Sequence, residues 1–174
     1  MVSCKNNNII LMGFMGVGKG SLARELLKLS NYMAIDTDDI IESMENTSIK
    51  KIFEKEGEAY FREAETKVSL WLEHSVKNTI ISIGGGFYHV DNLKNIGHVI
   101  YLESSFDAIV DRIKSSKNPE KKFKKRPLLQ DMAKAKALIN ERHPKYLTYA
   151  DTVIQTAGKK SSLIAEEIMQ LLEL

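Results

Sequence analysis

Five short apolar segments recur along this chain of 174 residues, and stretches with helical periodicity separate them. Residues 9–12, 79–83 and 98–102 are nearly continuous apolar runs, a pattern typical of strands buried on both faces of a parallel sheet. Residues 32–35 and 152–154 predict two further, shorter strands. Strands that alternate with helices indicate an α/β protein with a parallel sheet covered on both faces.

Apolar residues at helical spacing mark the segments between these strands. We expect helices at 22–30, from 38 or 39 to 44, at 49–53, 57–72, 106–113 and 131–149, and another after the third strand. A closing amphipathic helix is expected to be capped by Ser161 or Ser162. The lysine-rich segment 115–125 is interpreted as a polar loop. The expected architecture is a three-layer α/β/α unit, with residues 1–174 as one domain.

Composition narrows the class of protein only slightly. The chain is 43% hydrophobic and 28% charged with a formal net charge of +2, which favours neither a nucleic-acid partner nor a membrane surface. The N-terminal apolar run is too short for a signal peptide or membrane span, so we expect a cytoplasmic protein. Cys4, the single cysteine, permits no disulfide and has no base beside it. The four histidines show no metal-ligand spacing and are interpreted as structural or surface residues.

A glycine-rich turn follows the first predicted strand and opens the first helix: Gly13-Phe-Met15-Gly16-Val17-Gly18-Lys19. Glycines let backbone N–H groups turn inward around an anion, and the following helix directs its positive end at the same point. Lys19 is placed to reach the terminal phosphates of a nucleotide. The segment through Gly20 and Ser21 is therefore predicted to bind a nucleotide; a chance glycine-rich turn is the alternative.

Gly20 departs from the usual pattern, in which the lysine is followed by a serine or threonine that binds magnesium. The hydroxyl has moved to Ser21, which points about 100° away on a helix and is expected to contact an inner phosphate. Magnesium can instead be held by phosphate oxygens, waters and acidic groups. Weakened metal binding and lost activity are the two alternatives that this glycine raises.

Acidic residues stand at the carboxyl end of the second strand, where ligands collect on open α/β sheets. Asp36 and Asp38, as alternate residues, can divide two roles: one carboxylate can face a metal ion and its waters while the other binds a substrate hydroxyl. The alternative is a helix N-cap with acidic first-turn residues, to which Asp39 is assigned. Farther along the chain, Arg62 and Glu65 share a helical face, so that a held guanidinium can grip a carboxylate; the alternative is a surface ion pair.

Gly84, Gly85 and Gly86 follow the third strand and permit a ligand to approach the backbone closely, although a flexible turn would explain them too. Ser82, just before them, is a candidate contact for a metal-bound water. Segment 114–126 is interpreted as a lid over nucleotide phosphates. A nucleic-acid patch and a solvated loop are the alternatives, but aromatic residues that would stack on bases are nearly missing from it. Arg126 and Arg142 are expected to converge on anionic groups.

Five motifs in this order resemble the shikimate kinase family over nearly the whole chain. They are the glycine-rich turn, Asp-Thr-Asp at 36–38, Phe-Arg-x-x-Glu at 61–65, the three glycines and Arg-Pro-Leu-Leu at 126–129. The resemblance implies a P-loop kinase fold related to nucleoside monophosphate kinases, with strand order 2-3-1-4-5. It also implies transfer of the ATP γ-phosphate to the 3-hydroxyl of shikimate, in the route to chorismate and aromatic amino acids, with ATP and Mg²⁺ as cofactors. For a protein of this fold we expect a monomer by default.

The resemblance also implies roles for single residues. Lys19 and the glycine-rich turn would bind phosphates, and Asp38 would hold the hydroxyls of shikimate and act as the base. Arg62 and Arg142 would grip the shikimate carboxylate. Asp36 would contact magnesium through a water molecule, and Gly85 and Gly86 would contact the substrate through their backbone. Arg126 would stabilise the transferring phosphoryl group, and Arg112 is matched to the arginine that stacks on adenine. Segment 37–75 is expected to be a substrate-binding helical segment, and Gly84 belongs with the substrate-binding candidates. A related kinase, such as a gluconate kinase, and a non-catalytic nucleotide- or shikimate-binding protein remain alternatives.

Overall fold

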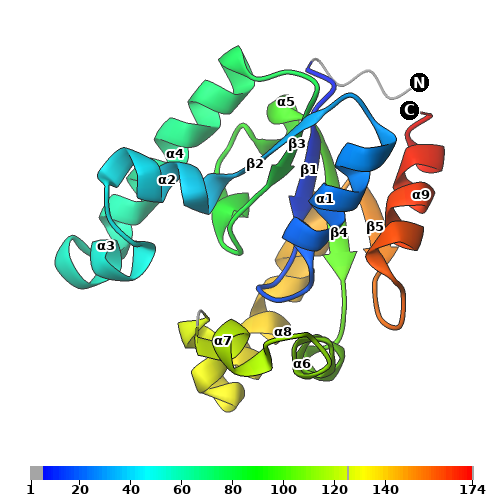
Figure 1. The fold of residues 1–174 in the computed structure, drawn as a ribbon. Helices are drawn as coiled ribbons and strands as arrows, with labels where there is room; N and C mark the ends of the chain where they lie inside the picture. Colours follow the sequence, from blue (N-terminus) through cyan, green and yellow to red (C-terminus); the bar gives the residue numbers. More distant parts are fainter. Residues whose placement is uncertain (1–5, 125, 174) are drawn as a thin grey trace.

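The computed structural model describes residues 6–124 and 126–173, with Pro127 described by its backbone alone (Figure 1). Cys4, the single cysteine, and Lys125, which belongs to the segment interpreted as a lid, lie outside the described residues.

The five strands form one parallel sheet in the order β2-β3-β1-β4-β5. This arrangement confirms the fold class and strand order given above. The strands are β1 (Ile9–Met12), β2 (Met33–Asp36), β3 (Thr79–Ser82), β4 (His98–Glu103) and β5 (Thr152–Gln155). Because β1 lies at the centre of the sheet, all four of its residues are buried.

Helices surround this sheet (Figure 1). They are α1 (Lys19–Leu29), α2 (Thr37–Glu45), α3 (Ile49–Lys55), α4 (Gly57–Ser75), α5 (Leu93–Ile96), α6 (Phe106–Lys114), α7 (Pro119–Lys124), α8 (Met132–Tyr149) and α9 (Ser161–Leu171), with 3₁₀ turns η1 (Phe87–His89) and η2 (Pro127–Gln130). Helices α1 and α9 pack against each other on one side of the sheet, and α8 passes behind β4. Helices α2, α3 and α4 project together beyond the β2 edge.

The N-terminal ends of α2 and α9 differ from those expected in how they are capped. Helix α2 begins at Thr37 because Asp36 is its N-cap and accepts a hydrogen bond from the Asp38 N–H at 2.9 Å. Asp39 therefore lies inside the first turn, where the helix dipole favours a negative charge. The expected capping of α9 by Ser161 or Ser162 is wrong: Lys160 occupies the N-cap position, without a side-chain hydrogen bond to the helix.

The lysine-rich segment expected to be a loop contains a helix, α7. Pro119 stands at its first position, which suits a residue without an N–H. Glu120 lies in the first turn and the lysines in the last, so their charges complement the helix dipole. These signals were present in the sequence, but the scarcity of apolar residues concealed them. The helical region expected after β3 is also reduced, to η1 and the four-residue α5.

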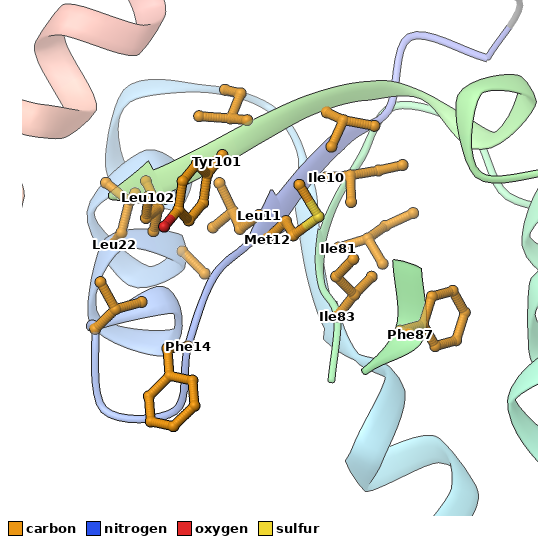
Figure 2. Close-up of a cluster of buried hydrophobic side chains, with 14 of the residues drawn as sticks. Ile10, Leu11, Met12, Phe14, Leu22, Ile81, Ile83, Phe87, Tyr101 and Leu102 are labelled. Atoms are coloured by element: carbon orange, nitrogen blue, oxygen red, sulfur yellow. The ribbon is translucent and has the colours of Figure 1, made fainter. Parts of the chain in front are cut away.

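The hydrophobic core extends directly beneath the loops at the carboxyl ends of the strands (Figure 2). Phe14 and Val17, which belong to the glycine-rich turn, are each only 2% exposed. Ile83 and Phe87 are buried on either side of the three glycines. Each such side chain contributes about 1.5–3 kcal/mol relative to an exposed position. Core residues thus anchor both the glycine-rich turn and the segment of three glycines.

Among the described residues, no helix has the length and apolar character needed to cross a membrane.

Candidate active site

The glycine-rich turn leaves β1 and enters α1 through backbone that favours glycine. Gly16 and Gly18 have φ angles of +85° and +109°, in the region that side chains rarely adopt. The Lys19 Nζ donates a hydrogen bond to the Gly13 carbonyl at 2.8 Å and so arches back over the turn. The Val17 side chain points into the core, which leaves only its backbone to face a phosphate. These residues form the phosphate loop, 13–19.

Helix α6 lies directly against the phosphate loop. A Cβ on Gly16 would lie 2.9 Å from the Ile113 Cδ1 atom, and one on Gly18 would overlap the Arg112 guanidinium. Arg112 also donates from Nη2 to the Ser161 Oγ at 3.0 Å, which links α6 to the start of α9. The residue that resembles the adenine-stacking arginine therefore lies at the outer side of the phosphate loop, between α6 and α9.

Four of the other predicted site residues act electrostatically on Lys19. Burial lowers the pKa of Lys19, and the negative charges of Asp36 and Asp38 oppose that shift. Arg126 and Arg142 lower the pKa further. Residues from α1, α2, α8 and the lid thus converge on one site, although more than 120 positions separate the first from the last.

Asp38 has the properties of a general base. Burial, assisted by the negative charge of Asp36, raises its pKa to about 6. Lys19 lowers the pKa, whereas Glu65 and Asp39 raise it further. A carboxylate with this pKa is largely ionised at neutral pH and is a stronger proton acceptor than an exposed aspartate.

The two residues expected near magnesium are neighbours in the sheet. Asp36 pairs with Ser82 across β2 and β3, and both line a cavity of about 600 Å³ together with Gly20. A Cβ on Gly20 would meet only the Arg24 Nη1 atom, at 3.8 Å, so nothing fills the place of the usual hydroxyl. No group of three or more His, Cys, Asp or Glu residues in the described part of the chain is arranged to hold a metal. These residues suit an ion held chiefly by phosphate oxygens and waters.

The triglycine segment, residues 84–86, is in close contact with three predicted substrate-binding side chains. A Cβ on its first glycine would lie 2.6 Å from the Asp38 Oδ1 atom. On the second glycine it would lie 2.8 Å from the Arg142 Nη1 atom, and on the third 2.6 Å from the Arg62 Nη1 atom. A side chain at any of the three positions would displace one of these groups, so glycine leaves all three in place. The two guanidinium groups consequently stand over adjacent residues.

Three side chains that sequence analysis did not assign to the site hold the backbone of the triglycine segment. Thr37 Oγ1 accepts a hydrogen bond from the Gly84 N–H at 3.0 Å, and the Tyr146 hydroxyl donates one to the Gly85 carbonyl at 2.7 Å. The His89 Nδ1 atom lies 3.0 Å from its third carbonyl. The position of Tyr146, four residues after Arg142 and so on the same helical face, was the signal that could have identified it.

Arg62 is held by two carboxylates of very different exposure. Its Nη1 donates to the Glu65 Oε2 at 2.6 Å, and its Nη2 donates to the Glu58 Oε1 at 2.8 Å. The Glu65 side chain is 1% exposed, whereas that of Glu58 is 66% exposed. Burial raises the pKa of Glu65, and Arg62 and His89 oppose the shift. The ion pair between Arg62 and Glu65 that the sequence predicted is thus partly buried, because the Glu65 carboxylate is removed from solvent.

Arg126 lies beside α7, and its Nη1 donates to the Lys122 carbonyl at 2.7 Å. Burial lowers the pKa of its guanidinium. The lysines of α7 are exposed around it. The arginine is thus tied to the lid while its charge reaches Lys19.

Comparisons with known proteins agree with this geometry. The family model described as shikimate kinase matches residues 15–173. A shikimate kinase of Helicobacter hepaticus is 38% identical over 167 residues, which cover 95% of this chain and 96% of that protein. One from Clostridium botulinum (strain Loch Maree) is 38% identical over 170 residues, covering 91% and 92%.

Solved structures give the same result. Shikimate kinase from Acinetobacter baumannii in complex with shikimate superimposes with a TM-score of 0.82 and 34% identity, covering 98% of this chain and 94% of that one. The enzyme from Bacteroides thetaiotaomicron gives a TM-score of 0.81 with 26% identity, covering 97% and 99%.

Proposed function

The chain belongs to the shikimate kinase family, and on that premise we propose that it transfers the γ-phosphate of ATP to the 3-hydroxyl of shikimate, giving shikimate 3-phosphate and ADP. One observation carries the proposal. A carboxylate with a raised pKa and two guanidinium groups meet on the triglycine segment, within the electrostatic reach of the phosphate-loop lysine.

On the acceptor side, Arg62 and Arg142 bind the carboxylate of shikimate. Two guanidinium groups over adjacent glycines offer paired donors to one planar anion. Glu65 keeps Arg62 in place, and the N–H groups of the second and third glycines remain available to the substrate. Asp38 then lies beside the first glycine, where it accepts the proton of the hydroxyl that attacks the γ-phosphate.

On the donor side, the phosphate loop holds the β- and γ-phosphates of ATP through its N–H groups and through Lys19. Arg126 brings a second positive charge from the lid to the transferring phosphoryl group. Phosphoryl transfer depends on positioning and on neutralisation of charge, and these residues supply both. Arg112, beside Gly18, is assigned to the adenine.

Magnesium, when bound with ATP, would neutralise charge on the β- and γ-phosphate oxygens. Asp36 would hold it through a water molecule, and the Ser82 hydroxyl would contact another bound water. Gly20 has no side chain to offer as a ligand. The protein would therefore contribute few direct ligands, and phosphate oxygens and waters would supply most of them.

Segment 37–75 is proposed as the part that closes on shikimate, and segment 114–126 as the lid over ATP. We also propose that the protein acts as a cytoplasmic monomer. In this lid, the role of the α7 lysines is to attract a polyanionic nucleotide and not a nucleic acid.

Two other functions are compatible with parts of the site. A pair of arginines does not by itself exclude an aldonic acid such as gluconate, and Gly20 motivates a binding protein without turnover. The family match and the relatives named above do not favour either one.

A coupled assay of ADP release with ATP, magnesium and either shikimate or gluconate tests the proposal. Turnover with shikimate supports it. Turnover with gluconate alone would show a related kinase, and binding of both ATP and shikimate without ADP release at any magnesium concentration would show a binding protein.

A further inference from the structure

Tyr146 joins two parts of the acceptor site that come from distant elements. The residue is fully buried on α8, and its hydroxyl donates to the Gly85 carbonyl. A Cβ on Gly85 would lie 3.5 Å from that hydroxyl and 2.8 Å from the Arg142 Nη1 atom. Tyr146 and Arg142 are one helical turn apart, so both reach the same glycine from the same face of α8.

The hydrogen bond from Tyr146 fixes the direction of a peptide group. Peptide bonds in the described chain are all trans, so the Gly86 N–H points opposite to the Gly85 carbonyl. Among the described residues, no backbone carbonyl accepts a hydrogen bond from the Gly86 N–H. By holding the carbonyl toward α8, Tyr146 directs the N–H away from it, to the side from which a ligand can approach.

The ring of Tyr146 is itself held by other aromatic residues. Tyr88, from the turn after the triglycine segment, meets it edge-on with ring centroids 5.5 Å apart. Tyr101, from β4, packs against it with ring centroids 5.1 Å apart. Burial raises the pKa of Tyr146 to about 12, so its hydroxyl keeps its proton at physiological pH and remains a donor.

We propose that Tyr146 is a positioning residue for the acceptor, which sets the Gly86 N–H and the Arg142 guanidinium at the spacing that one substrate carboxylate requires. The inference rests on the proposed function and deepens it. It assigns to a fully buried tyrosine a role in acceptor affinity distinct from the chemical step.

The test is Tyr146→Phe, which keeps the ring and removes only the hydroxyl. We expect KM for shikimate and its dissociation constant, measured by calorimetry, to rise about five- to tenfold, as for one lost buried hydrogen bond. The value of kcat should change less than about twofold, and KM for ATP should stay constant, because the phosphate loop is untouched.

Tyr101→Phe is the matched control. Its ring is also buried and packs on Tyr146, but its hydroxyl contacts the His143 Nδ1 at 3.0 Å and not the triglycine segment. It should leave KM for shikimate unchanged, and thermal unfolding of both variants reports any general loosening of the core.

Wild-type shikimate affinity in Tyr146→Phe would overturn the inference, and so would an equal loss in both variants. Failure of the wild-type protein to phosphorylate shikimate would instead contradict the proposed function, and calorimetry with shikimate separates the two results.

Discussion

The two halves of the site are constructed in different ways. The phosphate loop consists of seven consecutive residues. The groups that we propose to bind phosphate are mostly its backbone N–H groups, whose directions follow from local glycine conformations. The triglycine segment gathers side chains from α2, α4, η1 and α8. The phosphate loop is therefore a local structure, whereas the acceptor site exists only when distant helices are packed around it.

This difference predicts how substitutions divide between the substrates. Changes in the phosphate loop should affect chemistry or ATP, and changes around the triglycine segment should affect shikimate. Lys19 and Asp38 are the exceptions, because their charges act on each other across the boundary.

Lys19→Ala should cause the largest loss. Removing the cation beside the terminal phosphates is expected to lower kcat by about a thousandfold, since its charge stabilises the transition state. ATP turnover with saturating shikimate measures this, and Lys28→Ala, on the exposed side of the same helix, is the control. Near-normal turnover would mean that Lys19 only anchors the loop through the Gly13 carbonyl.

Asp38→Asn should lower kcat by about a hundredfold, because a general base is lost. In the wild-type protein, kcat/KM should decline as the pH falls below about 6, where Asp38 becomes protonated. A rate that is flat from pH 5 to 8 would exclude this role.

The same substitution should stabilise the fold. A raised pKa means that the folded state binds the Asp38 proton more tightly than the unfolded chain, so this contribution to stability is lost as the pH rises through 6. Asparagine removes the buried charge and should increase the free energy of unfolding at pH 7 by about 3 kcal/mol. Urea denaturation measures the free energy of unfolding of the variant and the wild-type protein, and the difference between them should vanish near pH 4.

Glu65→Gln and Glu58→Gln form a matched pair, because both residues bind the Arg62 guanidinium from the same helix. The buried Glu65 should matter more: we expect KM for shikimate to rise about tenfold, against less than twofold for the exposed Glu58. Equal effects would show that burial does not distinguish the two contacts. KM for ATP should remain constant in both.

Gly20→Ser should have the smallest effect, on the donor side only. Nothing obstructs the new side chain, and its hydroxyl would offer the missing magnesium ligand. We expect the magnesium concentration for half-maximal rate to fall about threefold, as for one added weak ligand. Gly20→Ala adds the Cβ without the oxygen and should have no such effect; an identical response of both variants would exclude a metal position here.

Much of the architecture was predictable because its signals are local. Apolar runs marked all five strands to within about two residues, and the glycines before Lys19 marked the phosphate loop. The errors lay where local signals are weak or compete. Neither of the serines expected to cap α9 does so, and the helical signals of α7 were weaker than its polar composition.

The sequence by itself determined the order of the motifs, the phosphate loop and the family, since each depends on residues close together in the chain. Only the tertiary structure decided that Thr37, His89 and Tyr146 hold the triglycine backbone, and that Glu65, not Glu58, is the buried partner of Arg62. The physical reason is that burial and orientation of a side chain depend on what packs against it, and these partners lie up to 61 positions away along the chain.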